Sequence, residues 1–317
     1  MENNSIAFFP ASGGIGGGTY RHLANLIDAK RLILVARSPE KVPEKYKAAG
    51  AVVRHGDYDH LETLEHAFDG ARYLNLVSYA SVSHKHRFNV QKAAIDAAIK
   101  SGVTHVFYSS LGFAGGADPN NTVAHVMKAH LDTERYLASL SASNPDFTYT
   151  VVRQGLYTES FPMYLAFLDL ANPPAEVKIP HDGTGPGISW VKRDELGEAT
   201  ARLIASYVRD PASFPHVDGT LLLSGPRDVS LGESVAIIGR ILGKDIKVRQ
   251  VSVDEWENQD SVRGASAYLE GGMAKPWATS WDALREGEGA AVTPHLRNLL
   301  GREPEAFEKT VADLAKQ

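Results

Sequence analysis

The chain has 317 residues, of which 43% are apolar and 22% charged, and its formal charge is −5 at pH 7. This composition excludes a disordered chain and makes nucleic acid a poor partner. Because cysteine is absent, a disulfide framework, a thiol nucleophile and a thiolate metal site are excluded as well. No apolar run is long enough to span a membrane, and the first residues lack the features of a signal peptide. We therefore expect a globular, cytoplasmic protein of two lobes, or of one α/β unit with an appendage.

Short apolar runs alternate with helical patterns along the N-terminal half. The runs lie at residues 6–9, 32–35, 51–54, 73–77 and 105–108. They are rich in apolar, β-branched or aromatic residues, which is typical of buried parallel strands. Helical stretches lie between them, and one of these begins with a capping-box pattern at Asp59 and Glu62 and has its expected stop at Gly70. The alternation predicts an α/β protein with a doubly wound parallel sheet, the Rossmann arrangement.

The same alternation continues past the midpoint. The expected elements are a helix at 122–140, a strand at 148–152, a helix at 195–207 and a strand at 220–223. Ser230 and Glu233 form a second capping-box pattern, which opens a helix that Gly243 closes. From residue 251 onward the chain is helical and loop-like. We expect a smaller α+β lobe that is interwoven with the first lobe.

A glycine-rich loop directly follows the first predicted strand, in the segment 8–18 (FFPASGGIGGG). Glycines at this place let the backbone approach a pyrophosphate, and the start of the next helix supplies free N–H groups. Gly13 and Gly16 have the spacing of the second and third glycines of the G-x-x-G-x-x-G variant, whereas Pro10 stands at the first position. The tight turn must therefore be built differently, because proline fixes φ and lacks an N–H. The expected phosphate-binding residues are Ala11, Ser12, Gly13, Gly14, Ile15 and Gly16; a glycine-rich turn without a ligand is the alternative.

Arg37 stands just after the second predicted strand, 21 residues beyond Gly16. An acidic residue at this place binds the ribose 2′-hydroxyl of NAD, whereas an arginine suits a 2′-phosphate. Ser38 offers a second donor. The alternative is an arginine on a solvated loop. Together with the glycine loop, Arg37 makes NADP(H) the expected cofactor.

Further motifs follow in a fixed order along the chain. They are VAR at 35–37, GDYD at 56–59, VSY at 77–79, AAIKSGV at 97–103, FYSSL at 107–111, VRQGLY at 152–157, WVKRD at 190–194, LSGP at 223–226 and LGREP at 300–304. In this order they resemble the NmrA-like family of atypical short-chain dehydrogenases/reductases, and within it the quinone-oxidoreductase-like subgroup. The resemblance implies an NADP(H)-binding Rossmann domain at 1–155, extended by parts of 186–225. It also implies a substrate-binding lobe at 156–317.

The resemblance further implies which residues contact the cofactor. Arg37 reads the 2′-phosphate, and Asp57 and Tyr58 lie beside the adenine. The residues that cover the nicotinamide ribose are Val77, Ser78 and Tyr79. Those that flank the nicotinamide are Gln154, Gly155, Leu156 and Tyr157.

Short-chain reductases usually carry Tyr-x-x-x-Lys on the helix after the fifth strand, where the lysine binds the nicotinamide ribose and the tyrosine donates a proton. The matching pair in this chain is Ala124 and Lys128, so the lysine is present and the tyrosine is absent. Lys128 is a candidate for anchoring the ribose or for donating the proton itself. His125 is a candidate proton relay on the same helix face. Tyr157 is a second candidate proton donor. The respective alternatives are a solvated lysine, a structural histidine and a tyrosine that only forms the wall of the site.

The missing tyrosine also bears on the substrate. A ketone that receives a hydride needs a positioned acid, whereas a quinone or an extended enone delocalises the incoming charge. We therefore expect an NADPH-dependent oxidoreductase that transfers a hydride to a quinone or a conjugated carbonyl of a small aromatic metabolite. One alternative is a non-catalytic NADP(H)-sensing regulatory protein. Another is a redox-neutral enzyme for dehydration, rearrangement or cyclisation on the same fold.

Two further groups of residues have a structural and a functional interpretation. The cluster HKHR at 84–87 has no carboxylate at ligand spacing, so we interpret it as a solvated helix start rather than a metal site. A set of aromatic residues either lines a flat apolar pocket for the substrate or belongs to the core. This set is Phe161, Tyr164, Phe167, Trp256, Tyr268, Trp277 and Trp281.

Overall fold

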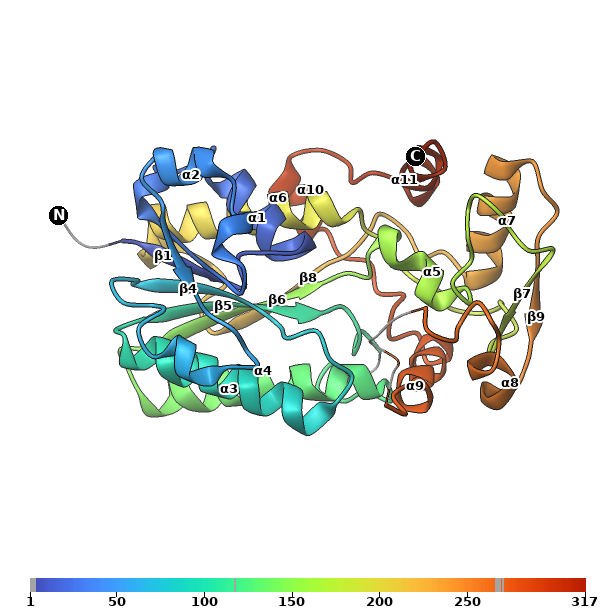
Figure 1. Ribbon diagram of the computed structural model, residues 1–317, viewed down its shortest axis with the longest axis horizontal. Helices are drawn as coiled ribbons and strands as arrows, with labels where there is room; N and C mark the ends of the chain where they lie inside the picture. The colour runs from blue at the N-terminus through green and yellow to red at the C-terminus, as the bar shows by residue number, and fades with distance from the viewer. Residues whose placement is uncertain (1–3, 117, 266–268, 270) are drawn as a thin grey trace.

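In the computed structural model, which describes residues 4–116, 118–265, 269 and 271–317, seven parallel strands form one sheet between two layers of helices (Figure 1). The strands are β1 (Ile6–Phe9), β2 (Leu32–Ala36), β3 (Val52–His55), β4 (Tyr73–Val77), β5 (His105–Leu111), β6 (Thr148–Gln154) and β8 (Gly219–Leu223). Their spatial order is β3-β2-β1-β4-β5-β6-β8. The predicted doubly wound Rossmann sheet is confirmed, and each predicted strand overlaps an observed one.

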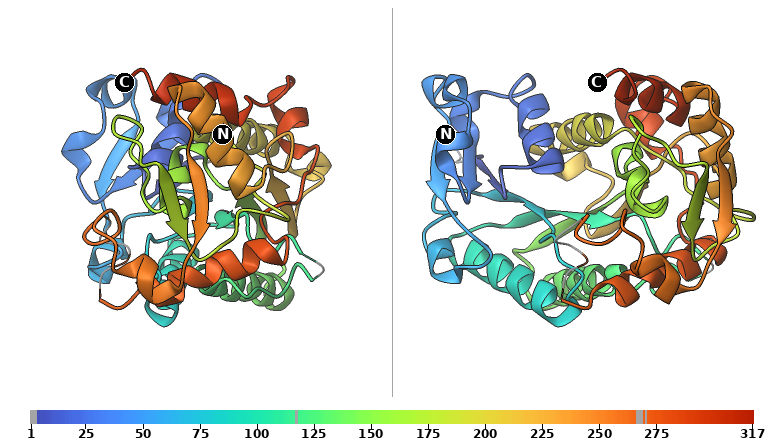
Figure 2. Two further views of the ribbon diagram at one scale, coloured as in Figure 1. Left: turned by 90° about the vertical axis from the view of Figure 1, so that its right-hand side faces the viewer. Right: turned by 45° about the vertical axis from the view of Figure 1, so that its right-hand side comes forward.

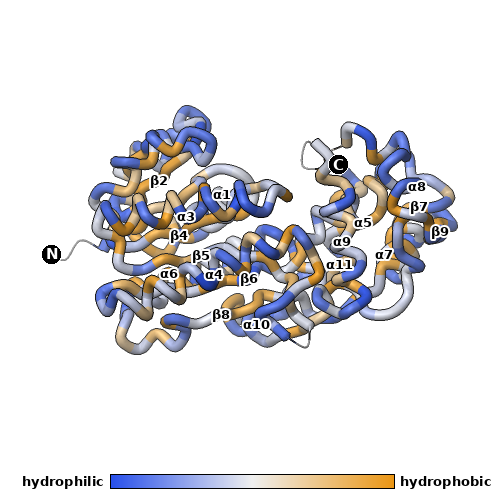
Figure 3. Tube along the Cα trace, turned by 90° about the horizontal axis from the view of Figure 1, so that it is seen from below, coloured by the Kyte–Doolittle hydropathy of each residue, from blue (hydrophilic) through white to orange (hydrophobic). Residues whose placement is uncertain are grey.

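Helices cover both faces of this sheet (Figures 1 and 2). One layer holds α1 (Gly14–Leu23), α2 (Glu44–Ala48), α6 (Arg193–Arg209) and α10 (His295–Leu300), and the other holds α3 (His84–Lys100) and α4 (His125–Ser143). The side chains of β1 alternate between the layers, since Phe8 packs in the core under α1 and Ala7 in the core under α3. Both α3 and α4 carry apolar and polar residues in turn, as Figure 3 shows from below. Because helices bury both faces of the sheet, the sequences of its strands are continuous runs of apolar residues.

A smaller lobe lies beside the carboxyl ends of the strands (Figure 2). Its two-stranded parallel sheet pairs β7 (Glu176–Ile179) with β9 (Lys247–Gln250). Its helices are α5 (Phe161–Tyr164), α7 (Leu231–Leu242), α8 (Val253–Glu257), α9 (Ala274–Arg285) and α11 (Phe307–Leu314). The chain is interwoven, because α6 and β8 return to the first lobe between β7 and α7. The sequence predicted an α+β lobe but not these two strands.

Helix α7 begins and ends as its sequence predicts. The Ser230 hydroxyl accepts a hydrogen bond from the Glu233 backbone N–H at 3.1 Å, which caps the helix start. At the other end Gly243 has a φ of 65°, the left-handed conformation that terminates helices. Short 3₁₀ turns occupy Ala29–Arg31, Pro39–Lys41, Leu61–Leu64, Thr158–Ser160 and Pro211–Ser213.

The predicted helix at 59–70 is wrong. This segment contains the 3₁₀ turn Leu61–Leu64 followed by further turns. The expected cap fails because the Asp59 carboxylate accepts a hydrogen bond from the Tyr79 hydroxyl, at 2.6 Å. In addition, the Arg54 guanidinium donates to the carbonyls of Ala67, at 3.1 Å, and Asp69, at 2.7 Å, so a side chain satisfies backbone groups that a helix would pair internally.

Within the described ranges, none of the helices has the length and apolar composition needed to cross a membrane.

Candidate active site

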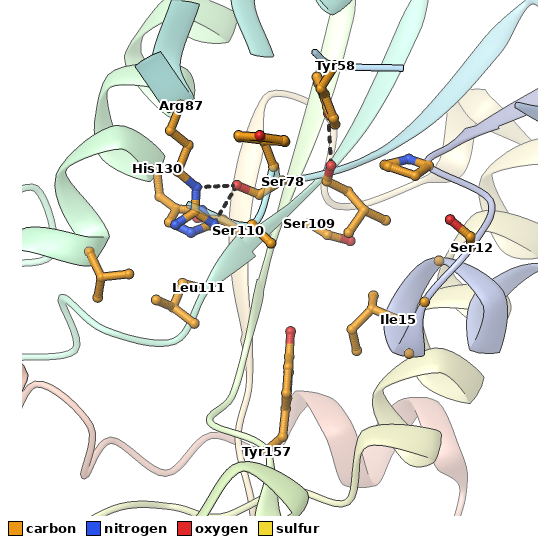
Figure 4. Close-up of a pocket in the computed structure, with 18 of the residues that line it drawn as sticks. Ser12, Ile15, Tyr58, Ser78, Arg87, Ser109, Ser110, Leu111, His130 and Tyr157 are labelled. Atoms are coloured by element: carbon orange, nitrogen blue, oxygen red, sulfur yellow. Dashed lines mark hydrogen bonds between the residues drawn. The ribbon is translucent and has the colours of Figure 1, made fainter. Parts of the chain in front are cut away.

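A cavity of about 690 Å³ opens at the carboxyl ends of the central strands (Figure 4). Residues after β1 and after β4 form its middle, which is the point where the strand order changes direction. Ligands of doubly wound sheets bind at such switch points, because the connections on either side lead to opposite faces and leave a crevice. Loops after β3, β5 and β6 and residues of the second lobe complete the walls.

The glycine loop brings the backbone to the wall of this cavity. Gly13 has a φ of 77°, and α1 starts at the next residue with no side chain capping its first N–H groups. A Cβ atom on Gly16 would lie 2.1 Å from the Pro10 carbonyl oxygen, so no other residue fits there. Pro10 follows a cis peptide bond, and the chain returns to the sheet through the Ala11 N–H, which donates to Val35 at 2.7 Å. The uncapped N-terminus of α1 is therefore available to an anionic group in the cavity.

An arginine from α6 lies over this helix start. A Cβ atom on Gly14 would lie 2.5 Å from the Arg193 Cδ atom, which places the Arg193 side chain against the glycine loop. Arg193 lines the cavity and is exposed to solvent. Its place is fixed because α6 packs along α1, where Gly18 and Gly197 approach each other closely. Arg193 was not among the predicted site residues, although it belongs to the motif at 190–194.

The cavity has two ends, which differ in their residues. At one end, called the outer end below, lie Arg37 and the acidic and aromatic residues of the loops after β3 and β4. The Tyr58 hydroxyl donates to the Val77 carbonyl at 2.9 Å, and its ring lies 5.3 Å from that of Tyr79. Burial and the neighbouring Asp59 carboxylate raise the pKa of Tyr79 to about 12. Burial also raises the pKa of Tyr58 well above its ordinary value, so both tyrosines are neutral at physiological pH. Their rings meet edge to face, at an interplanar angle of 62°, and form an aromatic wall close to the Arg37 guanidinium.

The inner end is apolar, with a few neutral polar groups. The residues that line it come from β5, α4, the segment after β6 and the second lobe: Ser109, Ser110, Leu111, Val126, His130, Leu156, Tyr157, Ser160, Met163, Tyr164 and Trp277. Tyr157 points its hydroxyl into the space below Ser109 and Ser110, opposite the β5 side of the cavity (Figure 4). No lysine and no glutamate is among the residues that line the cavity in the described part of the chain.

Arg87 lies at the wall between the two ends, and its position corrects one prediction. We expected a solvated helix start at 84–87, and α3 does begin at His84, but Arg87 is only 6% exposed. Its guanidinium donates to the Ser78 hydroxyl at 3.0 and 2.8 Å and to the Ser81 carbonyl at 2.9 Å. Gln91 accepts from Ser78 and from the Tyr79 backbone N–H. These bonds fix the loop after β4, which sequence reasoning had placed at the nicotinamide ribose.

The helix after β5 turns a different face to the cavity from the one expected. Val126 and His130, four residues apart, line the cavity, whereas Ala124 is the N-cap residue of α4 and Lys128 is exposed. The pair of residues four apart that lines the cavity is thus displaced by two positions from the expected pair. His125 does not line the cavity either. Its ring faces His84 at 6.0 Å, and burial, together with Lys128, lowers its pKa.

The remaining predicted residues fall into two groups. Those that line the cavity are Ser12, Gly13, Gly14, Ile15, Gly16, Arg37, Asp57, Tyr58, Val77, Ser78, Tyr79, Leu156 and Tyr157. Those that do not are Ala11, Ser38, Gln154 and Gly155. Gln154 is buried behind the wall, where its amide donates to Thr200 at 3.1 Å. A Cβ atom on Gly155 would lie 2.5 Å from the Leu223 carbonyl oxygen, so this glycine serves the packing of β6 against β8.

The aromatic set divides in the same way. Tyr164 and Trp277 line the cavity. Phe161, Trp256 and Trp281 are buried in the core of the second lobe, and Phe167 packs against that core. Tyr268 lies outside the described residues.

Comparison with known proteins gives a consistent set of similarities. The profile of the NmrA-like family matches residues 2–264. An NmrA-like family domain-containing oxidoreductase of Aspergillus flavus is 28% identical over 305 residues, which cover 93% of this chain and 89% of that protein. The triphenylmethane reductase of Citrobacter sp., solved with NADP(H), superposes with a TM-score of 0.75 at 25% identity, over 98% of this chain and 99% of its own. An NADPH-dependent quinone oxidoreductase of Escherichia coli, solved with NADPH, shares the fold with a TM-score of 0.78 at 23% identity, over 98% and 99% of the two chains.

Proposed function

Because the chain belongs to the NmrA-like family, we propose that it is an NADPH-dependent oxidoreductase that transfers a hydride to a quinone or a conjugated carbonyl of a small aromatic metabolite. One observation carries this proposal: a single cavity joins an uncapped helix start and two arginines to an uncharged aromatic inner end. The oxidoreductase from Aspergillus flavus and the NADP(H)-bound reductase from Citrobacter support it by similarity.

The residues at the outer end fit an NADP(H) molecule. The N–H groups at the start of α1 and the Arg193 guanidinium would hold the pyrophosphate, since both present positive charge to the same space. Arg37 would bind the 2′-phosphate, and Tyr58 and Tyr79 would form a wall for the adenine. A volume of about 690 Å³ lies in the range of roughly 300–1,000 Å³ that ligand sites usually have. Ala11, Ser38, Gln154 and Gly155 would support the site from behind.

The inner end favours an acceptor that needs no strong acid. When bound, NADPH supplies a hydride, which carries two electrons. A ketone would then bear an alkoxide, which is far more basic than the phenolate of a reduced quinone and therefore depends much more on a positioned acid. The Tyr157 hydroxyl lies at this end, but no lysine lines the cavity in the described residues to assist it as a proton donor, so an acceptor with a phenolate product suits the inner end best.

The direct test is a pair of titrations followed by turnover. Binding is followed by quenching of the tryptophans, one of which, Trp277, lines the cavity. We expect NADPH to bind more tightly than NADH, and to be oxidised in the presence of quinones and aromatic enones. Absence of NADPH binding would overturn the proposal. Binding without oxidation across quinones, enones and triphenylmethane dyes would instead identify an NADP(H)-sensing protein.

A further inference from the structure

Helix α4 has no cap from its own first residues. Its N-cap residue is Ala124, which has no side-chain oxygen to accept a hydrogen bond from the first N–H groups of the helix. Serine, threonine, aspartate or asparagine is preferred at this place, because those N–H groups have no partner inside the helix. Ala124 is fully buried, so water cannot serve as the acceptor instead. Other parts of the chain must therefore supply the acceptors.

Glu288, which follows α9 of the second lobe, holds the chain just before α4. Its Oε1 atom accepts a hydrogen bond from the Val123 N–H at 2.8 Å, and its Oε2 atom accepts one from the Thr122 hydroxyl. Thr122 in turn accepts from the Ala124 N–H at 3.1 Å, which fixes the direction of its own proton. The Oε2 atom also accepts from the Ala114 N–H, at 3.0 Å, in the loop after β5. Because Glu288 is only 4% exposed, these bonds are shielded from water.

Thr279 on α9 caps the next N–H group of α4. Its hydroxyl accepts from the His125 N–H at 2.8 Å and donates to the Pro276 carbonyl at 2.7 Å. Together with Glu288 it satisfies the backbone N–H groups of residues 123–125, directly or through the Thr122 hydroxyl. A carboxylate beside the start of a helix is also favourable, because the positive end of the helix dipole lies there. The start of α4 is thus capped from the second lobe.

The capped residues lead directly into the wall of the cavity. Val126 is the next residue of the chain, and it lines the inner end. The backbone of residues 123–125 is held at three consecutive N–H groups, so it cannot slide or turn without breaking these bonds. The position of Val126 in the wall therefore depends on Glu288 and Thr279. The outer end is built from other segments, namely the loops after β2, β3 and β4.

We propose that Glu288 is a positioning residue of the acceptor site, which acts through the first turn of α4 and, together with Thr279, holds Val126 in the wall of the inner end. The inference rests on the proposed function, in which the inner end receives the electron acceptor and the outer end receives the cofactor. Glu288 itself is not among the residues that line the cavity in the described part of the chain. A change at Glu288 should therefore weaken the binding of the acceptor far more than the binding of NADPH.

The test replaces Glu288 in the full chain and uses 1,4-naphthoquinone as the acceptor. Glu288→Ala removes the hydrogen bonds to Ala114, Thr122 and Val123, and we expect the KM for the quinone to rise by about 10-fold. The Kd for NADPH, measured by fluorescence titration, should stay within about threefold of wild type. Glu288→Gln keeps one carbonyl oxygen as an acceptor but replaces the other oxygen with a donor. Its KM should therefore lie between those of the wild type and Glu288→Ala.

Two further variants separate positioning from a general loosening of the fold. Glu195→Ala is the matched control, because Glu195 on α6 is also buried, at 5% exposed, and accepts a backbone N–H from a distant segment, that of Glu305 at 2.9 Å, but does not line the cavity. Its KM for the quinone should stay within about threefold of wild type. Val126→Ala changes the wall directly. Because Glu288 acts through the same turn, the KM of the double variant should exceed that of the larger single variant by less than about threefold.

Several results would overturn the inference. One is a KM for the quinone within about threefold of wild type in Glu288→Ala. Others are equal losses of quinone and NADPH binding, which indicate a loosened fold, and effects that multiply in the double variant. Failure of the wild type to bind or oxidise NADPH would instead overturn the proposed function. If Glu288→Ala does not fold, Glu288→Gln and Thr279→Val decide, and an unchanged KM in both counts against the inference.

Discussion

Two arginines reach the cavity from different elements, and their positions predict different effects on cofactor choice. Arg37 follows β2 at the outer end, whereas Arg193 begins α6 and lies over the glycine loop. The 2′-phosphate exists only in NADPH, but the pyrophosphate is common to NADPH and NADH. Substituting each arginine in turn therefore separates the two contacts.

Arg37→Glu should weaken NADPH binding by about 10- to 100-fold, because a charge-assisted hydrogen bond is worth roughly 1.5–3 kcal/mol. NADH lacks the phosphate, so its Kd should stay within about threefold. Fluorescence titration with both nucleotides measures the difference. Arg209→Glu, the same exchange at an exposed position that does not line the cavity, is the control. Equal losses for NADPH and NADH would contradict the 2′-phosphate assignment.

Arg193→Ala should weaken both nucleotides by a similar factor of about 10, which corresponds to roughly 1.4 kcal/mol. Arg193→Lys keeps the charge but loses the bidentate geometry, so its effect should be intermediate. The same titrations give both values. A loss confined to NADPH would show that Arg193 contacts the 2′-phosphate rather than the pyrophosphate.

At the level of single residues, local motifs identified the residues of the glycine loop and of the loops after β2, β3 and β4 that line the cavity, whereas the face of a helix could not be inferred. Gly13, Gly16 and Arg37 were found because each follows a strand whose end is readable in the sequence. His130 was missed and Lys128 chosen in its place, since both lie on one helix and the face of that helix which meets the cavity is set by tertiary packing. A shift of two residues turns a helix face by about 200°. Arg193 was missed because its approach to Gly14 depends on packing between distant segments.

Among the elements, the β1–α1 turn depends most strictly on close packing. Gly16→Ala would place a Cβ atom 2.1 Å from the Pro10 carbonyl oxygen, which forces the strand and the helix apart. We expect a loss of roughly 1–3 kcal/mol in the free energy of unfolding, together with weaker NADPH binding. Urea denaturation and titration measure the two effects.

The control for this variant lies on the same helix. At Gly18 the nearest atom to an added Cβ is 3.8 Å away, an ordinary contact. Gly18→Ala should therefore be neutral or should stabilise the protein by up to about 1 kcal/mol, because alanine favours helix. Equal destabilisation by both variants would contradict the packing argument.

Elements with local sequence signals were predicted, whereas elements that depend on tertiary contacts were not. The buried strands and α7 were predicted because their signals are local: continuous apolar runs, and a serine–glutamate cap with a terminal glycine. The segment 59–70 carried the same kind of cap signal and yet formed turns, because Tyr79 from the next loop binds the capping carboxylate. The strands β7 and β9 were not predicted, since each is only four residues long and the two pair with each other across about 70 residues of sequence. Tertiary contacts of this kind cannot be read from local patterns.

For the whole molecule, buried histidines predict how stability depends on pH. Burial lowers the pKa of His105 to about 3, and it lowers the pKa values of His130 and His181. Below about pH 6.5 these side chains bind protons in the unfolded chain but not in the folded one. The free energy of unfolding therefore falls as the pH decreases from 6.5 towards the folded pKa values. Each histidine contributes a slope of about 1.4 kcal/mol per pH unit.

His105→Gln should reduce this slope by about 1.4 kcal/mol per pH unit between pH 6 and 4. Urea denaturation at several pH values measures it. His66→Gln is the matched control, because the His66 side chain is 81% exposed. A slope in His105→Gln equal to that of the wild type would contradict the prediction.

Two neighbouring strands of the large sheet, β6 and β8, are far apart in the sequence, and this has a consequence for synthesis on the ribosome. β6 pairs with β8 along its free side, yet the residues 155–218 that separate them run through the second lobe and α6. At roughly 5–20 residues per second, the ribosome needs about 3 to 14 seconds to complete β8 after β6. During this interval the nascent chain carries an open sheet edge with the apolar side chains of Val151 and Val152, which another chain could pair with. The interwoven fold that builds the cavity thus leaves one edge of the sheet without its partner strand until β8 has been synthesised.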